Sequence, residues 1–172
     1  MATTTLVPVE EYLRTDYEPD CDYVDGVLEE RNLGEQTHGQ LEGEIFAYFS
    51  AKRKQPGVYP RLEWRVQISP TKFIVPDVCL LLKKTKEPIL TTPPFVIIEI
   101  LSPEDRITRM RRRIDDYLNF GVRHIWLIDP ESRRAWYCTG EGMTESKDLV
   151  LRTENPEIAL PLAEIFQAID EE

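Results

Sequence analysis

Three short apolar runs, at residues 75–82, 95–101 and 125–128, constrain the fold of this chain more than any other feature. Runs of this length and composition are typical of central β-strands that are buried on both faces. Between the second and third runs, residues 106–120 carry apolar side chains three and four positions apart and are followed by Gly121, which predicts a helix. Alternating strands and helices of this kind predict an α/β protein with a central mixed sheet flanked by helices.

Other segments extend this predicted sheet and its helical cover. Residues 36–53 repeat apolar side chains at helical spacing, which predicts a helix. Residues 62–68 alternate apolar and polar side chains, which predicts one half-buried strand. The Asp25-Gly26 pair between two β-capable runs predicts an N-terminal hairpin. We expect residues 149–151 to add an edge strand and residues 161–168 to form a last helix.

Length and composition predict one domain over residues 1–172, because domains usually have roughly 100–200 residues. Its expected parts are an N-terminal helix and hairpin at 8–31, a core at 36–140, and a C-terminal strand and helix at 148–170. The sequence contains no run of about 18 apolar residues and no basic-then-apolar leader, so we expect no membrane span. The three cysteines show no CxxC spacing, which favours a reduced cytoplasm over a disulfide framework or a zinc site.

Charge is unevenly distributed along the chain. The net charge is −10, which disfavours a protein that binds nucleic acid through overall positive charge. Residues 61–134 nevertheless carry +4, whereas residues 1–60 and 135–172 carry −7 each. Two interpretations fit this pattern: acidic ends that keep the protein soluble, or a locally positive site inside an acidic shell.

Two acids interrupt the predicted central strands. Glu99 lies inside the run 95–101, and Asp77 follows Pro76 at the start of another run. An unpaired ionised carboxylate is costly in an apolar interior, so each acid must be paired, protonated or bound to a metal. Asp77 can also be explained as part of a turn, and Glu99 as a residue near a strand end. Because the two strands are expected to be neighbours, we favour a shared site for both acids.

Paired carboxylates on neighbouring strands suit a hard cation. Mg²⁺ prefers one or two carboxylates together with waters and phosphate oxygens. Such an ion can activate water and neutralise charge on a leaving oxygen. The residues therefore favour Mg²⁺-dependent phosphodiester hydrolysis as the chemistry of this site, with Mn²⁺ as an alternative ion.

The predicted helix at 106–120 supplies positive charge. At about 100° per residue, Arg106, Arg109 and Arg113 fall on one stripe. The apolar stripe beside it, which we expect to face the sheet, contains Ile107, Met110, Ile114, Tyr117 and Leu118. Two neighbouring arginines, Arg111 and Arg112, are expected to point elsewhere. The arginine stripe is interpreted either as a solvated basic face or as a surface that faces phosphate.

Five motifs that include these residues occur in order along the chain. They are Val75-Pro76-Asp77-Val78, Glu99-Ile100-Leu101-Ser102-Pro103, Arg106 to Arg113 to Tyr117, Gly121-Val122, and Trp126-Leu127-Ile128-Asp129-Pro130. Over roughly residues 10–140 the chain resembles the Uma family of proposed restriction endonucleases, long classed as a domain of unknown function. That family is similar in core fold to the PD-(D/E)XK nuclease superfamily, so the resemblance implies a restriction-endonuclease-like fold.

The resemblance also implies roles for particular residues. Asp77 corresponds to the acid of the PD motif and Glu99 to the second metal-binding acid. In many members a Glu on the first core helix joins the metal site. Glu44 or Glu42 is expected to take that place here, and we name Glu44 as the expected metal ligand. The family Lys corresponds to Arg113, where this chain departs from the pattern. Arg stays charged and is a poor general base, so the departure bears on turnover more than on phosphate binding.

Several functions follow as alternatives. The first is a Mg²⁺-dependent endonuclease acting on nucleic acid, with DNA favoured over RNA and a homodimer as a possible assembly. Its catalytic residues are expected to be Asp77, Glu99 and Arg113. Arg106, Arg109, His38 and Gln67 are the expected substrate-binding residues. The alternatives are a module that binds nucleic acid or protein without cleavage, and a structural dimer subunit.

Overall fold

A six-stranded mixed sheet forms the centre of the computed structural model, which describes residues 6–31, 36–52, 57–103 and 107–171. In spatial order its strands are β10 (Gly142–Glu145), β9 (Arg134–Thr139), β8 (His124–Asp129), β7 (Val96–Ile100), β6 (Val78–Leu81) and β3 (Tyr59–Leu62). Strands β7 and β8 are parallel, and the other neighbouring pairs are antiparallel. The predicted mixed sheet is therefore confirmed.

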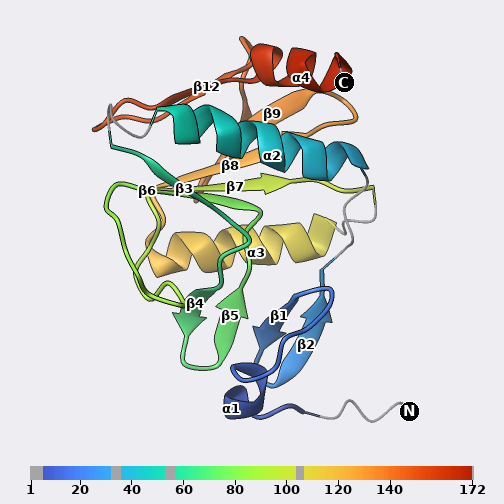
Figure 1. Cartoon of the computed structure of the whole chain (residues 1–172), viewed down its shortest axis with the longest axis vertical. Helices are drawn as coiled ribbons and strands as arrows, with labels where there is room; N and C mark the ends of the chain where they lie inside the picture. Colours follow the sequence, from blue (N-terminus) through green and yellow to red (C-terminus); the bar gives the residue numbers. More distant parts are fainter. Residues whose placement is uncertain (1–5, 32–35, 53–56, 104–106, 172) are drawn as a thin grey trace.

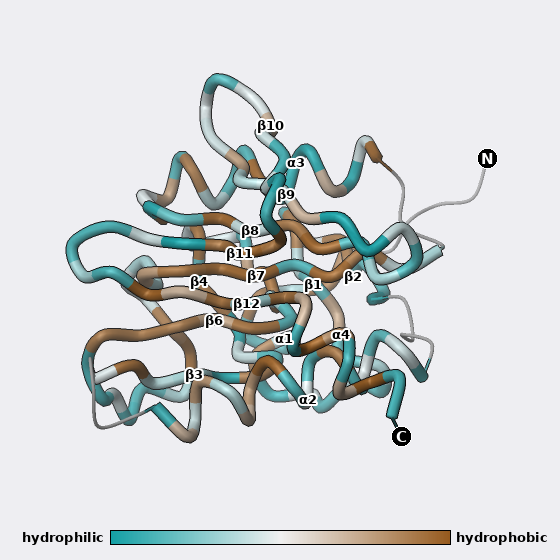
Figure 2. The backbone as a smooth tube through the Cα atoms, turned by 90° about the horizontal axis from the view of Figure 1, so that it is seen from above, coloured by the Kyte–Doolittle hydropathy of each residue, from teal (hydrophilic) through white to brown (hydrophobic). Residues whose placement is uncertain are grey.

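Helices cover both faces of this sheet (Figure 1). On one face lie α2 (Gln36–Ala51) and α4 (Leu162–Asp170), and on the other lies α3 (Ile107–Phe120). Side chains alternate along β7, so Ile98 packs in the cluster that contains α2, whereas Ile97 packs in the cluster that contains α3. Figure 2 shows the central strands as mostly hydrophobic segments between helices of alternating character.

A second, four-stranded sheet lies below α3 in Figure 1. Its order is β2 (Val27–Glu30), β1 (Cys21–Val24), β5 (Lys72–Ile74) and β4 (Val66–Ser69), and the short helix α1 (Val9–Tyr12) packs on it. The predicted hairpin is formed by β1 and β2. Its turn has positive φ angles at Asp25 (49°) and Gly26 (90°), as an Asp-Gly hairpin turn requires.

The predicted strand at 62–68 is wrong, because the chain breaks there into two strands of different sheets. Strand β3 ends at Leu62, and β4 begins at Val66. Between them Glu63 has a φ angle of 45°, and its backbone N–H donates to the carbonyl of Asp77 at 3.0 Å. The alternation of apolar and polar residues over 62–68 runs through this turn without a break, so the pattern carries no sign of it.

The C-terminal region differs from the prediction in one respect. Strand β11 (Val150–Arg152) pairs with β12 (Ala159–Pro161) in a separate two-stranded sheet instead of extending the large one. Leu151 and Leu160 are fully buried in the same cluster as α2 and α4. This small sheet therefore completes the core on the α2 face.

Helix α3 buries a different stripe from the one predicted. Met110, Ile114 and Tyr117 are buried against the sheet as expected. Ile107, however, is 74% exposed, whereas Arg113 is only 6% exposed. The inward stripe thus includes a charged residue, because acidic partners within the fold neutralise it. None of the helices in the described ranges has the length and apolar character needed to cross a membrane.

Candidate active site

Asp77 and Glu99 lie at matching ends of two neighbouring strands. The antiparallel register pairs Val78 of β6 with Ile98 of β7, and one further step along each strand brings the two acids opposite each other. Asp77 is 5% exposed and Glu99 is 2% exposed. Both acids line one cavity of about 40 Å³, which has room for more than one water-sized group. The expectation that the two acids lie on adjacent strands is therefore confirmed.

Glu99 points towards α3, which supplies two hydrogen-bond donors to it. Arg113 donates through Nη2 to Glu99 Oε1 at 2.7 Å, and the Tyr117 hydroxyl donates to the same oxygen. Burial raises the pKa of Glu99 to about 7, although the charge of Arg113 opposes this effect. Burial also raises the pKa of Tyr117, so its hydroxyl stays a donor. Glu99 is thus the acid of this site that takes up a proton more readily.

Asp77 is held by groups from three other segments. Its Oδ1 accepts from Arg31 Nη2 at 2.7 Å, and its Oδ2 accepts from the backbone N–H of Ile100 at 2.7 Å. The Nε2 atom of His38, on α2, lies 3.4 Å from Oδ2. Burial alone would raise the pKa of Asp77, but the hydrogen bond and charge of His38, the Arg31 charge and the Ile100 N–H together lower it. Asp77 therefore stays ionised.

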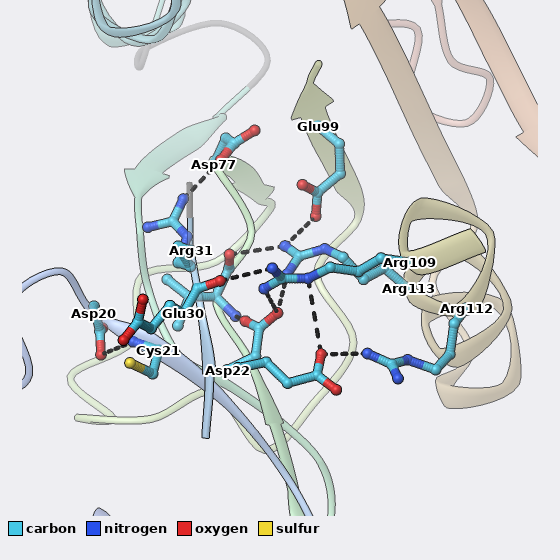
Figure 3. Close-up of polar contacts among 12 residues, drawn as sticks. Asp20, Cys21, Asp22, Glu30, Arg31, Asp77, Glu99, Arg109, Arg112 and Arg113 are labelled. Carbon is cyan, nitrogen blue, oxygen red and sulfur yellow. Dashed lines mark hydrogen bonds and ion pairs between the residues drawn. The ribbon is translucent and has the colours of Figure 1, made fainter. Parts of the chain in front are cut away.

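Acids of the β1–β2 hairpin face the arginines of α3 (Figure 3). Asp22, which is 2% exposed, contacts Arg113 through Oδ2, and Arg109 Nη2 lies 3.3 Å from the same oxygen. Arg112 contacts Glu29 at the exposed side of the hairpin and is not among the residues that line the cavity, so it points elsewhere, as expected. Arg109 and Arg113, the two described members of the arginine stripe, are therefore paired with a hairpin acid within the chain.

The structure brings together most of the predicted site residues. One cavity is lined by Asp77, Glu99, Arg113, Arg109 and His38, together with Arg31, Ile100, Ser102 and Met110. Arg106 lies outside the described residues. Gln67 is on β4, in the four-stranded sheet, and is not among the residues that line this cavity. Its predicted proximity to the site followed from the single strand expected at 62–68.

Glu42 lies beside this site. It is one helical turn after His38, with Glu42 Oε2 3.9 Å from His38 Nδ1. Burial, followed by the charge of Asp77, raises the pKa of Glu42 to about 7. Its Oε1 is buried and has no hydrogen-bond partner among the described residues. Glu44 is two residues further on, about 200° round the helix, so Glu42 is the acid of α2 that faces Asp77.

The carboxylates of this site suit Mg²⁺ better than zinc. Among the described residues, no three His, Cys, Asp or Glu side chains are gathered closely enough to enclose a metal ion. A zinc-type site, which needs three or four protein ligands, is therefore a poor fit. Mg²⁺ keeps several waters and uses one or two carboxylates, which the Asp77–Glu99 pair supplies. The unpartnered oxygen of Glu42 adds a further acceptor next to them.

Two charged residues of this site, one that contacts Asp77 and one that contacts Arg113, had no signal in the sequence. Asp22 and Arg31 belong to the N-terminal hairpin region, and only the packing of that region against α3 and β6 brings them to the site. Tyr117 did have a signal, since it follows Arg113 by four residues and lies on the same side of the helix.

Comparisons with known proteins agree with this fold. The model of the Uma2 family, described as "Putative restriction endonuclease", matches residues 9–168. A crystal structure of a "putative nuclease belonging to DUF820" from Anabaena variabilis superposes with a TM-score of 0.76 at 20% sequence identity, covering 94% of this chain and 98% of that one. The search of curated proteins found no match.

Proposed function

The chain belongs to the Uma2 family, whose model is described as "Putative restriction endonuclease", and we propose on that premise that it is a Mg²⁺-dependent endonuclease that hydrolyses phosphodiester bonds. One observation carries the proposal. Two buried carboxylates, Asp77 and Glu99, open into one cavity that an arginine-bearing helix also lines. Buried charges that converge in a cavity are costly unless paired, and they cluster at functional sites.

Asp77 and Glu99 are the proposed holders of the metal, and Glu42, in place of Glu44, is proposed as an acid beside the site that does not itself enclose the ion. When bound, Mg²⁺ supplies an activated water and neutralises charge on the leaving oxygen; Mn²⁺ is expected to substitute. Asp77 suits this role because it stays ionised. Glu42 Oε1, for which the described part of the chain offers no hydrogen-bond partner, can accept from a water at the site.

The proposed substrate is nucleic acid, with DNA favoured over RNA. Arg113 and Arg109 both line the cavity and can hold phosphate oxygens in a bidentate manner. Arg113 stays charged and does not act as a general base. Its proposed role is therefore to bind phosphate and to stabilise the charge that develops on it. His38, next to Asp77, is a further proposed phosphate contact, and a homodimer is the proposed assembly for duplex cleavage.

One observation favours a second candidate function, the binding of nucleic acid without cleavage. Arg31 and Arg113 already occupy oxygens of the two acids, at 2.7 Å each. Guanidinium groups in these places compete directly with a metal for the carboxylates. If they are not displaced, the arginines that line the cavity would still bind phosphate.

Cleavage assays distinguish the two functions. The purified protein is incubated with plasmid DNA, single-stranded DNA and RNA, each with Mg²⁺, Mn²⁺ or EDTA. The proposal expects metal-dependent cleavage that is lost in Asp77→Asn and Glu99→Gln and kept in Asp170→Asn, which changes an exposed acid at the end of α4. Binding of the same nucleic acids without cleavage by the folded wild type would favour the second function. Cleavage that survives in both site variants would contradict both.

A further inference from the structure

Asp22 is a buried carboxylate to which the proposed reaction assigns no role. Its Oδ1 accepts from the backbone N–H of Val75 at 2.9 Å, two residues before Asp77. Its Oδ2 contacts Arg113 and lies 3.3 Å from Arg109. One hairpin side chain thus joins the segment that leads to Asp77 with the arginines of α3 (Figure 3).

The guanidinium of Arg113 contacts two buried acids at once. Its Nη1 contacts Asp22, whereas its Nη2 donates to Glu99 at 2.7 Å and to the carbonyl of Val75 at 2.9 Å. The charges of Asp22 and Glu99 together hold the pKa of Arg113 above its ordinary value despite its burial. A buried guanidinium left without a charged partner is strongly unfavourable. Arg113 therefore has one acid to keep when it gives up the other.

We infer that Asp22 is a positioning residue, which retains Arg113 when Glu99 exchanges that guanidinium for the metal. The inference rests on the proposed function and concerns how the same site accepts its ion. In this exchange the contact between Arg113 and Glu99 breaks, and the contact between Arg113 and Asp22 persists. Arg113 gives up no proton in this exchange, because arginine stays protonated throughout.

The inference makes the charge of Asp22 a determinant of metal affinity. In Asp22→Asn the amide has nearly the same size and still offers an oxygen to the Val75 N–H. The negative charge is lost, however, so Glu99 becomes the sole carboxylate that Arg113 contacts among the described residues. Arg113 then competes more strongly with the metal for Glu99.

The test measures Mn²⁺ binding to the full chain by electron paramagnetic resonance, with thermal unfolding as a check on folding. Asp22→Asn is expected to weaken Mn²⁺ binding about tenfold, or about 1.4 kcal/mol. The matched control is Asp25→Asn on the same hairpin, an exposed acid that accepts a hydrogen bond from Thr71 and is expected to leave the affinity unchanged. The double variant Asp22→Asn/Arg113→Gln is expected to regain the affinity, because it lacks the competing guanidinium.

The outcomes separate this inference from the proposed function. Equal Mn²⁺ affinity in the wild type and Asp22→Asn would overturn the inference alone, as would a double variant that stays weak. A wild type that binds no Mn²⁺ would overturn the proposed function and the inference with it. Should Asp22→Asn fail to fold, Arg113→Gln and the double variant are compared. If Arg113→Gln and the double variant bind Mn²⁺ with equal affinity, Asp22 acts through Arg113. If their affinities differ, this role of Asp22 is contradicted.

Discussion

The two faces of the six-stranded sheet are built from the same strands, but they differ in chemistry. On the α2 face, side chains such as Ile98 and Trp126 pack against Phe49 in a cluster of apolar residues. On the α3 face, a comparable apolar cluster lies next to Glu99 and Arg113, both of which are buried. One face therefore contributes mainly to stability, while the other also holds charged groups together.

This difference shows that the buried charged groups on the α3 face must be paired with one another. A buried ion pair contributes little net stability compared with apolar packing, but the loss of one partner is costly. On the α3 face the buried charges are joined to one another, so that Arg113 has two acids and Glu99 has two donors. Departures from simple core packing are expected at functional sites. The two faces can be distinguished by four experiments.

The largest effect is expected on the apolar face. Phe49→Ala removes a fully buried ring from α2 and leaves a cavity, so we expect a loss of about 3–5 kcal/mol in the free energy of unfolding. Urea denaturation followed by circular dichroism measures this loss. A loss below about 1 kcal/mol would mean that the core collapses around the missing ring.

Two tyrosines compare the faces directly. Tyr117→Phe removes a hydrogen bond to a buried carboxylate, and we expect a loss of about 1.5–3 kcal/mol at pH 8. Tyr48→Phe removes a hydrogen bond to the carbonyl of Ala159 on the α2 face, for which about 0.5–1.5 kcal/mol is expected. Urea denaturation of both variants gives the comparison. Equal losses would argue against a special role for the charged acceptor.

Glu42→Gln tests the acid beside the site through its pH dependence. The pKa of Glu42 in the folded protein is about 7, above its ordinary value of 4.5, so its ionisation costs stability as the pH rises through this interval. We expect Glu42→Gln to be more stable than the wild type at pH 8, by about 1 kcal/mol or more, with most of this gain absent at pH 5.

Thermal unfolding at pH 5 and pH 8, with EDTA present, measures the gain for Glu42→Gln. His38 faces Glu42 and titrates as well, whereas Asp77 stays ionised, so the difference between variant and wild type is the informative quantity. A gain that is equal at the two pH values would show that the Glu42 carboxylate is not destabilised by ionisation.

The smallest effect is expected at the surface. Asp170→Asn breaks the ion pair with Arg133, in which both side chains are about half exposed. Exposed pairs of this kind are screened by solvent and add little stability. We expect no measurable change in the midpoint of urea denaturation. A clear loss would mean that charge pairs outside the α3 face matter more than their exposure indicates.

The sequence by itself determined the central elements of the fold. Runs of buried apolar residues predicted β6, β7 and β8, and helical periodicity predicted α2 and α3, because these patterns depend on local spacing. The sequence also identified Asp77 and Glu99, since a charge within an apolar run is conspicuous without any structure. Their places on adjacent strands followed from the order of the elements.

The tertiary structure alone decided how these acids are held. Asp22 and Arg31 are separated from their partners by 91 and 46 residues, so no local pattern connects them. The turn at Glu63 divides the one predicted strand between two sheets, so Gln67 lies in the four-stranded sheet. Helical spacing predicts on which side of α3 Arg113 lies. Its charge can be buried, however, only because other segments bring acids into contact with it. Long-range electrostatic pairing of this kind is a property of the packed molecule.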